Sequence, residues 1–226
     1  MALRTARDAL SRFFYQRCFW LFVMLLALIA VAPFLPATMH GRIAYNWINA
    51  FVLIATVAAV GRTLLSFVIV LLLAVPTIAF QWLGLVDGDE GSLLNSWIFG
   101  TALYLATTTY LLRYVFRPEV MTTDKLFGAA ASYLMLGILW AYLYVLVGHF
   151  YPLSYLVRGE PASLSVYEAL YFSMTVLTST GFGDIAPLTR QVQAVCIVEQ
   201  VTGGLFVAIL IARLAGVYPP RRRETE

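Results

Sequence analysis

Residues 178–184, Thr-Ser-Thr-Gly-Phe-Gly-Asp, are the part of this sequence whose residue types and spacing could do chemistry. Two glycines flank one aromatic residue, and glycine adopts the positive φ angles that side chains penalise. Such a backbone can point successive carbonyl oxygens in one direction. A ring of these oxygens, built from several copies of the loop, replaces the hydration shell of a cation. The pattern therefore predicts that backbone carbonyls of this loop coordinate an ion.

The same glycines also fit a second motif. Residues 181–186 read Gly-Phe-Gly-Asp-Ile-Ala, which matches the dinucleotide-binding pattern G-x-G-x-x-A. That interpretation needs a strand before the glycines and a helix after them in a βαβ unit. The preceding stretch instead has the apolar pattern of a short helix, and no acidic residue follows at the required distance. The sequence favours the ion-binding interpretation.

The composition is that of a membrane protein. Of 226 residues, 61% are hydrophobic and only 12% are charged. Because a membrane span needs about 20 mainly apolar residues, and Gly61-Arg62 interrupts the long stretch 43–84, we expect an all-α membrane protein with six transmembrane helices. The predicted spans are 19–37, 44–60, 64–85, 92–112, 126–150 and 192–217.

The basic residues predict the orientation. With both termini in the cytoplasm, all but three of the 15 Lys and Arg residues fall on the inner side, leaving Arg42, Arg158 and Arg190 outside. This agrees with the positive-inside rule and predicts a multi-pass protein of the plasma (inner) membrane. The net charge of +3 then reports topology and gives no support for a nucleic-acid partner. Residues 1–18 alternate apolar and basic residues, which predicts a cytoplasmic amphipathic leader.

The last hundred residues resemble the pore domain of the potassium channel superfamily, whose filter loop reads T-V-G-Y-G. Here the loop has the Gly-Phe-Gly form. Ser165 and Glu168 have the spacing of a capping box, which predicts a re-entrant pore helix from Ser165 to about Thr178. The resemblance implies that residues 118–217 form an outer helix, a pore helix, a filter and an inner helix. It also implies a homotetramer.

The resemblance implies potassium as the permeant ion, with no other cofactor and no enzymatic activity. The resemblance places the ion-binding filter at residues Ser179, Thr180, Gly181, Phe182 and Gly183. Loop carbonyls, with the Ser179 hydroxyl, would bind K⁺ at the first four of these residues. Ser179 stands where Thr is usual, Thr180 where Val or Ile is usual, and Val176 replaces another hydroxylated position. None of these changes removes a carbonyl, so we expect potassium selectivity. A weakly selective monovalent cation channel of the same fold is the alternative.

Several residues are expected to support this filter. Phe182 replaces the usual Tyr, and the resemblance pairs it with Phe172, so that packing would replace a hydrogen bond. Thr178 and Asp184 flank the filter loop on either side.

Glu199 lies inside the last span, where an unpaired carboxylate costs about 2.5–3.5 kcal/mol. We expect it to meet the hydroxyls of Thr175, Thr178 or Thr180, or else to be a neutral packing carboxyl.

Two glycines follow in the last span. Gly203 lies 20 residues after Gly183, at the family position of the gating hinge, and Gly204 follows it. A glycine pair in a helix indicates either a bend or close packing of helices. The sequence leaves both interpretations open.

The first four predicted spans lack a voltage sensor. Residues 92–112 contain no Arg or Lys, whereas sensing needs several of them in the fourth span. We therefore expect residues 19–117 to form a four-helix membrane domain without voltage-sensing arginines. Residues 218–226 are expected to be a short cytoplasmic tail. A transporter or scaffold with a substrate-binding re-entrant loop is a rival from another class, but such proteins usually carry two corresponding broken segments.

Overall fold

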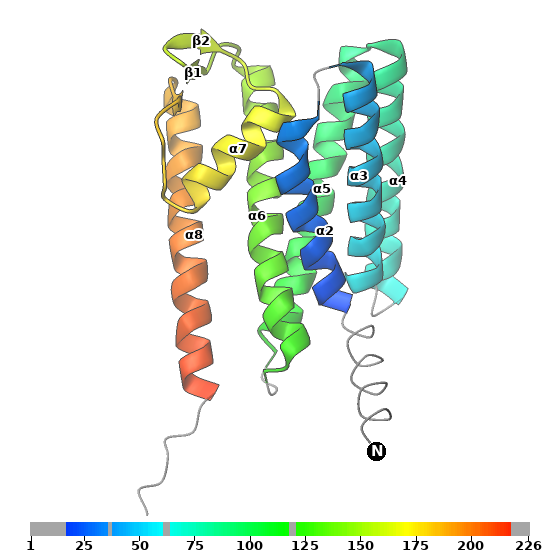
Figure 1. The fold of residues 1–226 in the computed structure, drawn as a ribbon, viewed down its shortest axis with the longest axis vertical. Coiled ribbons are helices and arrows are strands. Elements are labelled where there is room, and N and C mark those ends of the chain that lie inside the picture. The colour runs from blue at the N-terminus through cyan, green and yellow to red at the C-terminus, as the bar shows by residue number, and fades with distance from the viewer. Residues whose placement is uncertain (1–16, 36–37, 61–63, 118–120, 218–226) are drawn as a thin grey trace, which may run out of the picture.

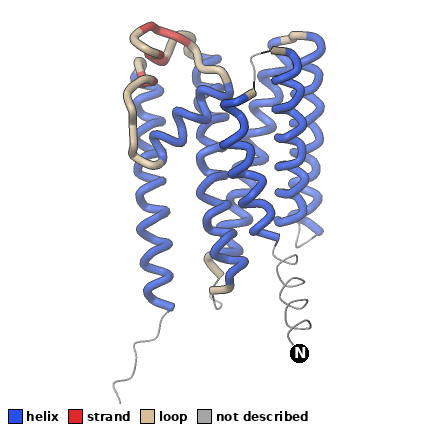
Figure 2. Tube along the Cα trace, viewed as in Figure 1, coloured by secondary structure: helices blue, strands red, loops and turns tan. Residues whose placement is uncertain are grey.

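The computed structural model of the chain describes residues 17–35, 38–60, 64–117 and 121–217. Almost all of this part is helical, as Figures 1 and 2 show. The predicted tail at 218–226, the break at Gly61-Arg62 and nearly all of the predicted leader lie outside the described residues.

The first part of the chain is a bundle of long helices. It contains α2 (Arg17–Val31), the short 3₁₀ helix η1 (Ala32–Phe34), α3 (Met39–Val60), α4 (Leu64–Asp87) and α5 (Glu90–Val115). The predicted span 19–37 was too long, because the α-helix ends at Val31. Pro33 follows there and has no N–H group to continue the helical hydrogen bonds.

The second part contains two long helices with a short helix and a small sheet between them. Helix α6 (Thr123–Phe150) is followed by β1 (Tyr155–Val157), β2 (Glu160–Ala162), α7 (Val166–Leu177), β3 (Ile185–Pro187) and α8 (Arg190–Val217). The strands are antiparallel in the order β2-β1-β3, and Tyr155 is paired with both Ala162 and Pro187. The sheet therefore joins the segment before α7 to the segment after the glycine loop.

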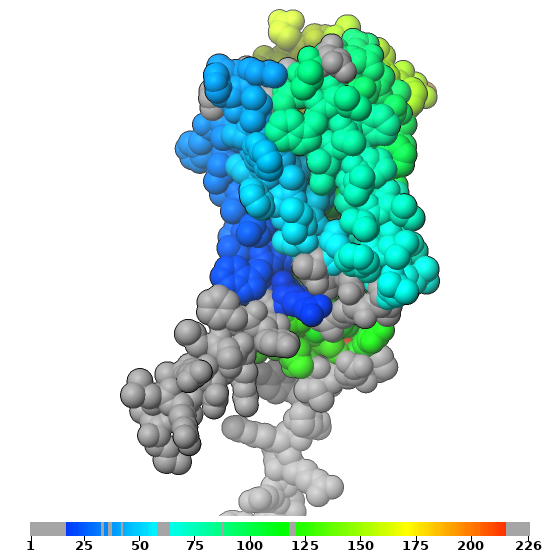
Figure 3. All heavy atoms as spheres, turned by 90° about the vertical axis from the view of Figure 1, so that its right-hand side faces the viewer, coloured from blue at the N-terminus to red at the C-terminus, as the bar shows by residue number. Residues whose placement is uncertain are grey.

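Helix α6 is the centre of the fold. It packs against α2, α5, α7 and α8, and its buried side chains include Met135 and Tyr144. In Figure 1, α7 slants between α6 and α8, and α8 stands at the edge of the molecule. The face seen in Figure 3 is formed by the first helices of the bundle, in blue to green.

Three of the described helices are long and apolar enough to cross a membrane, by length and composition. They are Leu64–Val86, Thr123–Phe150 and Arg190–Ala215. Helix α2, with 15 residues, is shorter than these. The count of six spans therefore remains a prediction.

A hydrogen-bonded contact joins the end of α8 to the end of α5. Arg213 donates to the carbonyl of Phe116 at 2.8 Å and also to the carbonyl of Arg117. Its guanidinium lies 5.4 Å from the centre of the Phe116 ring. The end of the last helix is thus attached to the connection between the two parts of the fold.

Candidate functional site

Helix α7 begins as the sequence predicts. Ser165 Oγ accepts a hydrogen bond from Glu168 N at 3.3 Å, and Ser165 N donates to Glu168 Oε2 at 2.9 Å, which confirms the capping box. The helix has 12 residues and ends at Leu177, with Thr178 as its C-cap. At a rise of about 1.5 Å per residue it is only about 18 Å long, too short to cross a bilayer.

The loop after α7 has an alternating backbone. Positive φ angles occur at every second residue, +57° at Ser179, +51° at Gly181 and +84° at Gly183. When left-handed and right-handed backbone angles alternate, successive carbonyls point toward the same side of the loop. The predicted positive φ at Gly183 is confirmed. The positive φ at Ser179 was not predicted, since non-glycine residues seldom adopt it.

The N–H groups of this loop are bonded to the end of α7. Thr180 N and Gly181 N both donate to the carbonyl of Thr175, at 2.8 and 3.2 Å, and Ser179 N donates to Val176 at 2.9 Å. Among the described residues, no N–H or O–H group donates a hydrogen bond to the carbonyl oxygens of residues 179–182. These oxygens are therefore free to accept a ligand, and all four residues are exposed in the single chain.

The residues beside the loop hold it at both ends. Thr178 Oγ1 donates to the carbonyl of Met174 at 2.7 Å and lies 2.8 Å from Thr180 Oγ1. Asp184 accepts a hydrogen bond at its carbonyl from Arg158 N at 2.8 Å. The loop thus runs from the end of α7 to the small sheet with a backbone anchor at each end.

The expected partner of Phe182 is wrong. Phe172 is only 3% exposed, and its ring packs against Tyr144 and Tyr155, with centroids 4.9 and 5.9 Å away. Phe182 stacks instead on Tyr171, at 6.4 Å and an interplanar angle of 7°. The reason is the helical periodicity of α7, which turns Phe172 into the core and the adjacent Tyr171 toward the loop.

The expected partners of Glu199 are also wrong. Its carboxyl is fully buried and bonds to Ser173 Oγ, at 2.5 Å, and to the hydroxyl of Tyr144. Thr175 and Thr178 instead bond to carbonyls within α7. The sequence carried a signal for one partner, since Ser173 is a small polar residue between the aromatic and apolar side chains of α7.

Ser173 connects three helices. Its hydroxyl lies within hydrogen-bond distance of both Glu199 Oε1 and the Gly137 carbonyl of α6, at 2.5 and 2.7 Å. One hydroxyl has a single proton to donate, so both bonds can form only if residue 199 supplies the second proton. A protonated carboxyl or an amide at that position would complete the network.

Gly203 lies against the end of α7. A methyl group added at Gly203 would overlap the carbonyl of Leu177, whereas nothing lies within 4 Å of such a group at Gly204. The same Leu177 carbonyl accepts a hydrogen bond from Tyr133 of α6 at 3.1 Å. Close packing alone accounts for glycine at 203. Helix α8 is continuous through both glycines, and the hinge role stays a prediction.

Comparison with known proteins agrees with this geometry. Residues 130–218, from within α6 onward, match the family model described as "Ion channel". The chain is also 37% identical over 62 residues to the voltage-gated delayed rectifier potassium channel KCNH1 of Rattus norvegicus, Bos taurus and Homo sapiens. That match covers 27% of this chain but only 6% of those relatives. The chain matches no solved structure.

The short capped helix, the free carbonyls and the family match together define an ion channel domain in residues 130–218. The 37% identity to a potassium channel over 62 residues shows a likeness of part of the chain to the potassium channel superfamily.

Proposed function

We propose that this protein is a potassium-selective channel that conducts K⁺ passively through a filter formed by residues 179–183. The observation that carries the proposal is the alternation of positive φ at Ser179, Gly181 and Gly183 beside carbonyls that accept no hydrogen bond from the described part of the chain. Carbonyl oxygens stacked in this way replace the water around a dehydrated cation. No cofactor beyond the permeant ion is needed for this function.

The functional unit is a homotetramer. One chain contributes one loop, which is a quarter of a carbonyl ring, and cyclic symmetry supplies the remainder. Helix α8 supports this assembly because it exposes a series of large apolar side chains that lipid or neighbouring chains would cover. They are Ile197, Val198, Val201, Leu205, Ile209 and Ile211.

The chain lies in the plasma (inner) membrane with six spans and both termini in the cytoplasm. The ends of α5 and α8 are bonded together through Arg213, so the basic residues near both ends lie on one side. Under the positive-inside rule this is the cytoplasmic side. The filter then opens outward past Asp184.

The alternative within the same fold is a weakly selective cation channel. It is favoured by the exposed Thr180 and by Phe182, which stacks on Tyr171 and has no hydroxyl with which to brace the filter. Separate measurement of K⁺ and Na⁺ flux into liposomes that contain the purified protein distinguishes the two. A clear K⁺ preference supports the proposal, and equal fluxes support the alternative.

A further inference from the structure

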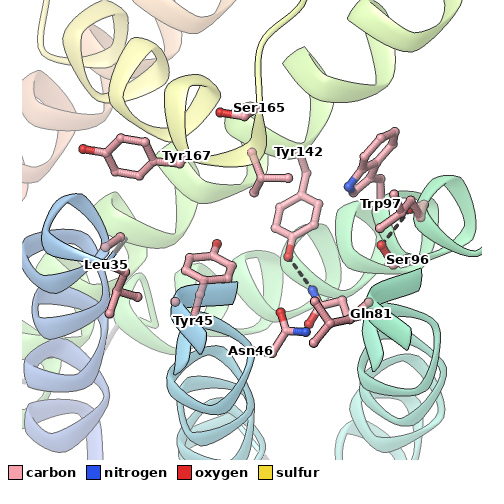
Figure 4. Close-up of a pocket in the computed structure, with 14 residues that line it drawn as sticks. Leu35, Tyr45, Asn46, Gln81, Ser96, Trp97, Tyr142, Ser165 and Tyr167 are labelled. Atoms are coloured by element: carbon pink, nitrogen blue, oxygen red, sulfur yellow. Dashed lines mark hydrogen bonds between the residues drawn. The ribbon is translucent and has the colours of Figure 1, made fainter. Parts of the chain in front are cut away.

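A cavity of about 490 Å³ lies between the first helices and the start of α7 (Figure 4). This volume is within the range of pockets that bind small molecules, about 300–1,000 Å³. Five helices contribute side chains to its wall. These include Tyr45 of α3, Gln81 of α4, Trp97 of α5, Tyr142 of α6 and Tyr167 of α7.

The chemistry of this wall selects an uncharged ligand. Its lining residues include four aromatic rings and the neutral polar side chains of Asn46, Gln81, Ser96 and Ser165, and none of the described lining residues is charged. A charged ligand would lose its hydration here without gaining a counter-charge. An apolar or aromatic body with one hydrogen-bonding group fits this lining.

Some polar groups at the cavity have no hydrogen bond to a described residue. Gln81 is bonded to Asn49 and Tyr142 at 3.0 and 3.1 Å. By contrast, the Tyr45 hydroxyl and the Asn46 amide have no hydrogen bond to any described residue. Figure 4 shows both side chains at the cavity. Since partly buried polar groups normally find a partner, these two can bond to a ligand.

The cavity also touches the structure that holds the filter. Ser165, Val166 and Tyr167 line it, and they are the cap and first two residues of α7. The opposite end of this 12-residue helix carries the carbonyls that anchor the filter N–H groups. A ligand bound against the first turn of α7 therefore contacts a short helix whose other end is hydrogen-bonded to the filter loop.

We propose that this cavity is a binding site for uncharged amphiphilic small molecules, of the alcohol or phenol class, that modulate conduction through α7. The effect on conduction rests on the channel function proposed above, whereas the binding does not.

Photolabelling of the full chain in liposomes tests the binding. The probe is a benzyl alcohol that carries a trifluoromethyl diazirine, and the matched control is the corresponding benzylammonium. We expect adducts of the alcohol on Tyr45, Trp97 or Tyr167, reduced by excess benzyl alcohol, and at least about tenfold less labelling by the ammonium probe. Adducts confined to side chains on the outside of the bundle, such as Phe51 and Ile54, would overturn the proposal.

A matched pair of variants tests the contact. Tyr45→Phe removes only a hydroxyl that has no hydrogen bond to the residues that the structure describes, so we expect the fold to be retained and labelling of the cavity to fall about two- to tenfold. Tyr110→Phe, which also removes a hydroxyl but lies outside the cavity lining, leaves labelling unchanged. Equal labelling of both variants and the original chain contradicts the site.

Flux measurements separate the two proposals. Benzyl alcohol should change K⁺ flux in the original chain and change it less in Tyr45→Phe. Cavity labelling without any effect on flux overturns the modulation while leaving the binding site. Cavity labelling in a protein that conducts no ions refutes the proposed channel function instead.

Discussion

The carboxyl of Glu199, on α8, is hydrogen-bonded at 2.5 Å to the hydroxyl of Ser173, on the pore helix α7. The same carboxyl bonds to Tyr144 of α6. One buried group therefore connects the two long helices of the pore domain to the short helix that holds the filter. We expect the position of α7 to depend on this connection.

Substitution of Glu199 tests how much the filter depends on it. Glu199→Gln retains a group that can bond to both Ser173 and Tyr144, so we expect selectivity and assembly close to those of the original chain. Glu199→Leu leaves both hydroxyls without this partner, at about 1–3 kcal/mol for each unsatisfied group. We expect that variant to lose K⁺ selectivity or tetramer stability, measured by ion flux and by thermal unfolding.

Ser173→Ala provides the control from the other side of the bond. It should weaken the protein less than Glu199→Leu, because Tyr144 still bonds to Glu199. If Glu199→Leu behaves like the original chain in both measurements, the network has no role in holding the filter.

The two glycines of α8 form a second matched pair. Gly203→Ala places a methyl group on the Leu177 carbonyl, and the backbone must shift, at about 1–3 kcal/mol. Gly204→Ala meets no atom within 4 Å and replaces glycine in a helix, so it should be neutral or stabilising. Thermal unfolding of the purified protein measures both. Equal effects of the two substitutions would show that α8 does not pack here as described.

Local features of the pore region were predictable from sequence, and long-range pairings were not. The cap at Ser165 and the positive φ at Gly183 depend on neighbouring residues, and both predictions were confirmed. The partners of Glu199 and Phe182 depend on how α7 and α8 are rotated about their axes. That rotation is set by packing against α6. The sequence does not specify this packing, and the partners predicted for both residues were therefore wrong.

The cavity had no sequence signal. Its polar residues come from five helices and are far apart in the chain, and each is ordinary in its own helix. The chain of hydrogen bonds from Tyr104 through Asn49 and Gln81 to Tyr142 was missed for the same reason.

Voltage should have little effect on conduction. Helix α5 carries Arg113 in its last turn and no other Arg or Lys. Since one charge moved across 100 mV gains only about 2.3 kcal/mol, the single arginine of α5 cannot support steep voltage gating. Planar-bilayer recording at a series of voltages measures the response. Activation by several effective charges per chain would contradict the prediction.

Low pH should loosen the start of α5. Asp89 caps this helix by accepting hydrogen bonds from Ser92 N at 2.9 Å and Ser92 Oγ at 3.0 Å. The bond from the Ser92 backbone is the largest cause that lowers the pKa of this carboxyl, and the side-chain bond adds to it. Because the folded-state pKa is lowered, the cap contributes above the unfolded-state pKa and is lost as the pH falls through the folded-state pKa.

The amide resonance of Ser92 reports this transition. It should move as the pH falls through the folded-state pKa of Asp89, and it should stay fixed in Asp89→Asn, which caps without titrating. A similar shift in both proteins would assign the change to another group.

The filter assignment is tested most directly by K⁺ and Na⁺ flux in a pair of glycine variants. Gly183 and Gly159 both have positive φ, +84° and +92°, and neither has an atom within 4 Å of an added methyl group. Alanine therefore strains both backbones by a similar amount, about 1–2 kcal/mol. Only Gly183 lies in the proposed filter. We expect K⁺ flux well above Na⁺ flux in the original chain and in Gly159→Ala, and loss of K⁺ flux in Gly183→Ala. Unchanged K⁺ flux in Gly183→Ala would contradict the assignment of residues 179–183 as the ion path.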